Sequence, residues 1–134
     1  MSRRAITNFC AISTGLFLLV IGILHSIVNV SGVQRAIERG EIPPRLGDSV
    51  LVNAAFSGVA MSMLGLLVLL VLPGLRAGSR QAARVATAIG IFVGILGVSG
   101  YLWAPTKPRV LIFLFCGALL AAPLLIWRRE FSNT

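Results

Sequence analysis

Residues 9–30 read FCAISTGLFLLVIGILHSIVNV and contain no Asp, Glu, Lys or Arg. A helix of this length can cross the hydrocarbon core of a bilayer, which takes about 20 apolar residues. Three similar stretches follow, separated by short loops that carry arginine: Val50–Leu72, Val85–Trp103 and Val110–Trp127. We therefore predict the all-α class, as a membrane-embedded bundle of four antiparallel helices.

The composition is that of a membrane protein. Hydrophobic residues make up 57% of the 134 residues, charged residues 12%, and the mean hydropathy is +0.93. Soluble domains carry about 25% charged residues. The four spans and their loops account for nearly the whole chain, which predicts a single integral membrane domain over residues 1–134. The first apolar run is longer than that of a secretory signal, so we interpret it as a transmembrane helix.

The net charge of +8 comes from basic residues that flank the spans. Four spans put both termini on one side, together with seven of the twelve basic residues: Arg3, Arg4, Arg76, Arg80, Arg84, Arg128 and Arg129. The other side has five: Arg35, Arg39, Arg45, Lys107 and Arg109. This excess predicts cytoplasmic termini. No basic run is interleaved with aromatic residues, so we exclude nucleic acid as a partner.

The loop between the first two spans has an order of its own. Val33–Arg39 can form two helical turns lying on the bilayer surface. Gly40 is expected to end these turns, and Pro43 with Pro44 to prevent their continuation. Asp48 or Ser49 is expected to cap the second span.

One face of the first span is small and polar. Its members recur at steps of three and four residues: Asn8, Ala11, Gly15, Leu18, Gly22, His25 and Asn29. Small residues let a neighbouring helix approach closely, and polar groups inside a membrane face protein or water. Asn53 and Ser57 lie at matching depth in the second span, which returns from the same side. We predict that these side chains cluster with His25 and Asn29.

The third span extends this candidate site. Gly90, Gly94 and Gly97 share a face with Tyr101, whose hydroxyl reaches the same outer level as Arg109. The predicted ligand-binding residues are therefore His25, Asn29, Asn53, Ser57, Tyr101 and Arg109. If the chain is an enzyme, His25 and Tyr101 are the catalytic candidates, because imidazole and phenol groups can transfer protons.

His25 has three interpretations. It can be a structural hydrogen-bonding group that joins two helices, a binding or catalytic group, or a ligand of a metal or haem. Zinc takes at least three protein ligands, and the spans hold no carboxylate and no second histidine. We therefore predict no metal site and no cofactor.

Several classes of membrane protein are excluded by what the spans lack. Small proton-coupled multidrug exporters need an embedded glutamate, and membrane prenyl transferases need paired acidic motifs. Neither occurs in the predicted spans. Cys10 and Cys116 form no Cys-x-x-C pair, which excludes a disulfide-forming enzyme, and both are expected to be buried.

The layout resembles that of the DoxX-like four-span bacterial membrane proteins. The resemblance is carried by Gly22-Ile-Leu-His25 at the polar end of the first span and by Leu64-Gly65-Leu66-Leu67 in the second. It implies a bacterial cytoplasmic membrane. Because some family members are subunits of larger membrane redox assemblies, it also implies that an accessory role is open. It carries over no catalytic residue.

The leading functional expectation is a small integral membrane protein that binds a membrane lipid or lipophilic small molecule, or that serves as an accessory subunit of a larger membrane complex. One alternative is a cofactor-independent enzyme, isomerase-like or cyclase-like, that moves protons on an isoprenoid or sterol-like substrate through His25 and Tyr101. A second is a purely structural assembly factor. Whether the chain is an enzyme stays open. The small-residue faces also favour homo-oligomers.

Overall fold

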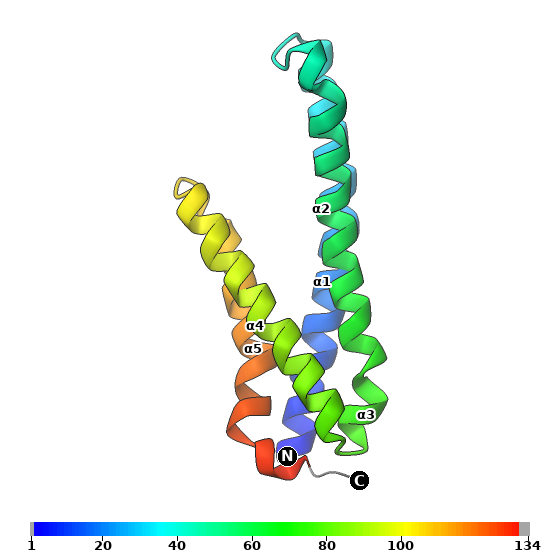
Figure 1. Ribbon diagram of the computed structural model, residues 1–134, viewed down its shortest axis with the longest axis vertical. Helices are drawn as coiled ribbons and strands as arrows, with labels where there is room; N and C mark the ends of the chain where they lie inside the picture. The colour runs from blue at the N-terminus through cyan, green and yellow to red at the C-terminus, as the bar shows by residue number, and fades with distance from the viewer. Residues whose placement is uncertain (1, 132–134) are drawn as a thin grey trace. The chain divides into compact units, whose positions relative to one another are not determined.

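The computed structural model describes residues 2–131. The predicted all-α class is confirmed, and no strand occurs among these residues. The helices, labelled in Figure 1, are α1 (Arg3–Glu38), α2 (Pro44–Leu70), α3 (Leu72–Arg76), α4 (Arg80–Trp103) and α5 (Leu111–Ile126). Two single 3-10 turns complete the described chain, η1 (Pro108–Val110) and η2 (Arg128–Glu130).

Four helical segments of the described chain are long and apolar enough to cross a membrane, as the sequence predicts. The first is α1, and the second is formed by α2 and α3 together. The third is α4, and the fourth is formed by η1 and α5 together. At about 1.5 Å per residue, the 36 residues of α1 extend over about 54 Å and the 16 residues of α5 over about 24 Å. The hydrocarbon core of a bilayer is about 30 Å thick. The spans are therefore unequal in length.

The first loop differs from the prediction. Helix α1 continues without a break to Glu38, so residues 33–38 extend the first span and do not form a separate surface helix. Gly40 has a φ of 72° and follows the end of α1, as expected. Helix α2 begins at Pro44, so neither Asp48 nor Ser49 caps it. Proline suits a first helical position because the missing N–H would have no partner there.

The chain divides into two compact units, which we describe separately. Unit 1 combines Met1–Gly15 with Leu67–Thr134, and unit 2 is Leu16–Leu66. Residues 1 and 132–134 of unit 1 lie outside the described residues.

Unit 2 is a hairpin in which the second half of α1 lies beside most of α2 (Figure 1). The two helices meet at small residues. A Cβ added to Gly22 would lie only 2.6 Å from the backbone nitrogen of Ser62, and one added to Gly58 would lie 2.7 Å from that of Ser26. The Ser26 hydroxyl donates to the Ala55 carbonyl at 3.1 Å, and the Ser62 hydroxyl is 3.3 Å from the Leu19 carbonyl. Gly22, a member of the small face predicted for the first span, therefore packs against α2 in this unit.

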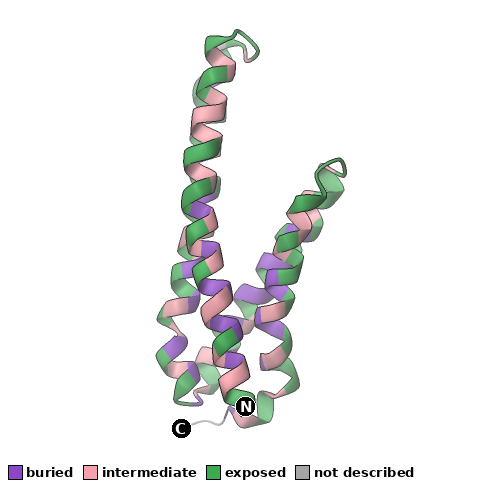
Figure 2. Cartoon of the chain, turned by 180° about the vertical axis from the view of Figure 1, so that it is seen from behind, coloured by how far each residue is buried: buried purple, intermediate pink, exposed green. Residues whose placement is uncertain are grey.

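Unit 1 contains a second hairpin, formed by α4 and α5. Its helices approach through glycine as well: the backbones of Gly90 and Gly117 are in contact, and a Cβ at Gly117 would lie 2.5 Å from the Gly94 nitrogen. Ser79 caps α4 by accepting a hydrogen bond from the Ala82 nitrogen. Figure 2 shows buried residues along this unit. Among residues 2–131, all but one of the side chains described as buried and hydrophobic belong to it, the exception being Leu18 of unit 2.

The two ends of the described chain meet in unit 1. Arg3 forms an ion pair with Glu130 at 3.3 Å, and Nη2 of Arg4 donates to the Glu130 carbonyl at 2.8 Å. The Arg4 guanidinium also lies against Gly78, whose φ of 80° suits glycine. Phe131 is buried with an exposed fraction of 5%. These contacts hold the C-terminal segment in place beside α4.

Candidate functional site

The predicted polar face of α1 contains one short hydrogen bond. His25 and Asn29 are one helical turn apart, and the Asn29 amide nitrogen lies 2.6 Å from Nε2 of His25. Both residues are partly buried. The imidazole therefore has a partner on its own helix.

Asn53 and Ser57 do not share this bond. Both are exposed on α2, and the Ser57 hydroxyl donates to the Ala54 carbonyl of its own helix at 2.9 Å. No hydrogen bond among residues 2–131 joins either of them to His25 or Asn29. Asn53 instead lines an open depression of about 470 Å³ on α2, with Asp48, Ser49, Val52 and Phe56. The four predicted residues of unit 2 thus form a bonded pair on α1 and two exposed side chains on α2.

The remaining predicted residues belong to unit 1. Tyr101 lies in the last turn of α4 and is 37% exposed, and Arg109 is exposed in η1. The predicted residues are therefore shared between two units, and their assembly into one site stays a prediction. Cys10 and Cys116 are free and buried, as expected. The described part of the chain holds no group of three His, Cys, Asp or Glu residues that could bind a metal.

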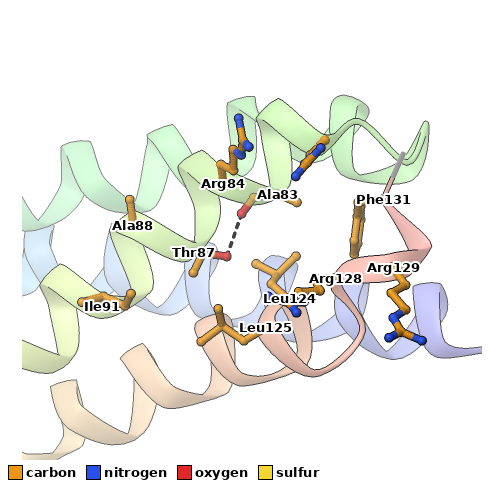
Figure 3. Close-up of a pocket in the computed structure, with 11 residues that line it drawn as sticks. Ala83, Arg84, Thr87, Ala88, Ile91, Leu124, Leu125, Arg128, Arg129 and Phe131 are labelled. Carbon is orange, nitrogen blue, oxygen red and sulfur yellow. Dashed lines mark hydrogen bonds between the residues drawn. The ribbon is translucent and has the colours of Figure 1, made fainter. Parts of the chain in front are cut away.

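Sequence analysis missed a larger groove in unit 1, drawn in Figure 3. It has a volume of about 800 Å³ and lies between α4 and the C-terminal end of the described chain. Four arginines line it: Arg80, Arg84, Arg128 and Arg129. Its other lining residues on α4 are Ala83, Thr87, Ala88 and Ile91, and those of the C-terminal side are Leu124, Leu125 and Phe131.

The α4 side of the groove follows from helix periodicity. Arg80, Arg84, Thr87, Ala88 and Ile91 are spaced so that they share one face. The polar end of this face is therefore the first two turns of α4, and the apolar end begins about one turn later. The Thr87 hydroxyl donates to the Ala83 carbonyl at 2.8 Å, so its polar atom is satisfied within α4.

The opposite side depends on how α5 ends. The helix stops at Ile126, and the turn η2 carries the chain onward to Phe131. Figure 3 shows Thr87 on one side of the groove and Leu124 and Phe131 on the other. The guanidiniums of Arg84 and Arg129 extend outward in different directions, so they lie at the rim of the groove, while Ile91, Leu124 and Leu125 contribute apolar side chains to its lining.

The rim is strongly positive. Arginine is protonated at all relevant pH values, and none of the residues that line the groove is acidic. Glu130 is next to Arg129 in sequence, but its carboxylate pairs with Arg3. An apolar interior next to four cations suits an amphiphilic anion.

Part of this groove was visible in the sequence. The spacing of Arg80 and Arg84 indicates a shared helix face, but both were interpreted only as charges that flank a span. Arg128 and Arg129 reach the groove because the chain turns at η2, and no helix pattern in the sequence predicts this turn.

Comparisons with protein-family models, curated proteins and solved structures find no match to this chain. The DoxX-like resemblance therefore stays a prediction.

Proposed function

We propose that this protein is an integral membrane protein that binds a lipophilic molecule, and that the arginine-rimmed groove of unit 1 is its binding site. The observation that carries the proposal is the groove itself. Its volume of about 800 Å³ lies within the range of about 300–1,000 Å³ that is usual for small-molecule sites.

The groove is open to a lipophile that arrives through the bilayer. Ile91 and Leu125, one from each helix, are 49% and 53% exposed. In a membrane such side chains contact hydrocarbon, so a lipophilic molecule can enter sideways without crossing water. Binding by burial of apolar surface needs no catalytic group.

The enzymatic alternative has less support. Proton transfer requires His25 and Tyr101 to reach the same substrate within hydrogen-bond distance. The described contacts give His25 a partner on its own helix and give Tyr101 an exposed position. His25 belongs to unit 2 and Tyr101 to unit 1, so neither unit by itself holds both proton-transfer groups.

The proposal includes a membrane location and an orientation. We place the chain in a bacterial cytoplasmic membrane with both termini in the cytoplasm, as the excess of seven basic residues over five supports. The arginine rim then lies in the inner leaflet. Reporter fusions after residue 134, one active only in the cytoplasm and one only outside it, should give signal from the cytoplasmic reporter alone. The reverse would overturn the orientation.

The binding proposal is tested by mass spectrometry of molecules that stay bound after extraction into native lipid discs and transfer to mild detergent. Wild-type protein should retain a lipophile in defined stoichiometry. Ala88→Trp, which fills the groove from an exposed position, should lose it. Ala122→Trp is the matched control, because Ala122 is exposed on α5 and does not line the groove. If neither wild type nor control retains a lipophile, or if Ala88→Trp retains as much, the proposal fails.

A further inference from the structure

We infer that the lipophile is an acidic phospholipid, with its phosphate among the arginines of the rim and an acyl chain along the α4–α5 hairpin. This inference rests on the proposed function and adds the chemical class of the ligand. Two observations carry it: the charge of the rim, and a second groove that continues from the first.

The rim concentrates more positive charge than its own lining residues can neutralise. Arg80 and Arg84 belong to α4, Arg128 and Arg129 belong to the C-terminal segment, and no lining residue is acidic. Guanidinium groups bind phosphate oxygens in a bidentate manner, and basic pockets between transmembrane helices bind acidic head groups. A phosphodiester would supply the negative charge that the lining residues lack.

The neighbouring carboxylate is committed elsewhere. Glu130 directs its side chain to Arg3, and its carbonyl accepts a hydrogen bond from Arg4. The arginines near the chain ends therefore have two roles. Arg3 and Arg4 hold the C-terminal segment, and the rim arginines face the groove. The positive charge of the rim is therefore best neutralised by an anion that is not part of the chain.

The second groove supplies the place for an acyl chain. It has a volume of about 380 Å³, runs between α4 and α5, and shares Ile91 with the first groove. Gly90, Gly94 and Gly117 line it, and a Cβ added to Gly94 would have only Leu114 within 4 Å, at 3.8 Å. Its lining reaches Val98.

The length of this path fits one leaflet. From Arg84 to Val98 is 14 residues, or about 21 Å along the helix axis. Half of a hydrocarbon core of about 30 Å is about 15 Å. A chain that begins at the rim can therefore follow the hairpin to the middle of the bilayer, past a lining that is apolar except for Ser99 at its far end.

The test is a native mass spectrometry titration of delipidated protein in a neutral detergent. The two probes are phosphatidylglycerol and phosphatidylcholine, each with one palmitoyl and one oleoyl chain, so that they differ only in the head group. Wild-type protein should bind phosphatidylglycerol at least tenfold more tightly. The Arg84→Gln/Arg128→Gln variant should lose about thirtyfold in affinity for phosphatidylglycerol, at roughly fivefold for each arginine near an acidic head group.

The matched control removes the same charge elsewhere. Arg35 and Arg76 are exposed and do not line the groove, so Arg35→Gln/Arg76→Gln should keep the wild-type affinity within about twofold. An equal loss in both double variants would mean general attraction to the protein surface and would overturn the inference. Ala88→Trp should lower the affinity for both lipids by the same factor, because it blocks the groove and leaves the rim arginines in place.

Two further outcomes separate this inference from the proposed function. Equal affinity for both lipids would overturn the acidic head group and leave lipophile binding intact, whereas no binding of either lipid would overturn both. Inorganic phosphate at millimolar concentration is the remaining arm. If it displaces phosphatidylglycerol completely, the rim is a site for free anions, and the lipid assignment is wrong. The melting temperature of each variant in phosphatidylcholine must equal that of the wild type. If Arg84→Gln/Arg128→Gln melts at a lower temperature, Arg84→Lys/Arg128→Lys replaces it. The lysine variant should bind phosphatidylglycerol more tightly than the glutamine variant and more weakly than the wild type.

Discussion

The α1–α2 hairpin of unit 2 and the α4–α5 hairpin of unit 1 both bring two helices together at glycine, but they hold the contact differently. In unit 2, Gly22 and Gly58 are flanked by Ser26 and Ser62, whose hydroxyls bond to carbonyls of the facing helix. In unit 1, Gly90 and Gly117 meet backbone to backbone. No side-chain hydrogen bond within residues 2–131 joins α4 to α5.

The difference shows two ways to hold two helices together inside a membrane, where the hydrophobic effect does not favour their contact because lipid tails are as apolar as the side chains. Helix association in a membrane depends on close packing and on hydrogen bonds between helices. Unit 2 combines both, and its seam is narrow. Unit 1 depends on packing, and a groove lined by Gly90, Gly94 and Gly117 runs along its seam. A groove between two helices therefore accompanies the seam that has no hydroxyl bonds across it.

The largest effect is expected from Gly117→Ala. Its methyl group would meet backbone atoms of Gly90 and Gly94, which no side-chain movement can relieve, so α4 and α5 must separate. Overpacking of this kind costs about 1–3 kcal/mol, and we expect the upper end. Gly94→Ala is the control, because its methyl group would lie 3.8 Å from Leu114 at the nearest. Unfolding titrated with sodium dodecyl sulfate measures both; equal stability of the two variants would contradict the backbone contact.

A somewhat smaller loss is expected from Gly58→Ala in unit 2. One of its three close neighbours is the Ser26 side chain, which can rotate, while the other two are backbone atoms. We expect a loss of about 2 kcal/mol in the free energy of unfolding. Gly32→Ala should raise stability slightly, since Gly32 has open space around it and alanine favours helix. A loss in Gly32→Ala as large as that in Gly58→Ala would argue against the seam.

Removing the serine hydroxyls should have a moderate effect confined to unit 2. Ser26→Ala removes a hydrogen bond to the facing helix, and Ser62→Ala removes one that is shared between Leu19 of the facing helix and Gly58 of α2. Such bonds contribute about 0.6 kcal/mol on average in membrane proteins. Ser57→Ala is the matched control, because its hydroxyl bonds only within α2. A control variant that loses as much as Ser62→Ala would mean that the cross-helix bonds add nothing.

The smallest effect is expected from His25→Asn. The imidazole bonds to Asn29 one turn away, and polar pairs at this spacing contribute about 0.2–0.5 kcal/mol. The melting temperature should fall by no more than a few degrees, and retention of the lipophile should not change. A loss of bound lipophile at unchanged melting temperature would return the candidate site to the outer polar face.

The sequence predicts the spans well because the bilayer imposes length and apolarity on them. The stop at Gly40 and the burial of Ala11, Gly15, Leu18 and Gly22 follow from backbone and packing rules of the same generality. The continuation of α1 beyond Val30 could also have been foreseen, since Gly32 is the only weak helix former before Gly40.

The candidate sites were harder to predict. Matching depth brought Asn53 and Ser57 level with His25, but depth does not define the rotation of α2 about its axis, and both side chains are exposed. The spacing of His25 and Asn29 needed only helix geometry, and their bond is present. The groove could not be predicted without the turn η2, because a single turn leaves no periodic pattern in the sequence.

The unequal helices also bear on what projects from the membrane. Helix α1 is about 54 Å long, whereas a bilayer with its head groups is about 40–45 Å thick. At a tilt of about 20°, the average for transmembrane helices, α1 still covers about 51 Å of the membrane normal. The end of α1 that carries Arg35 and Glu38 should therefore stand beyond the head groups as a rigid rod in water.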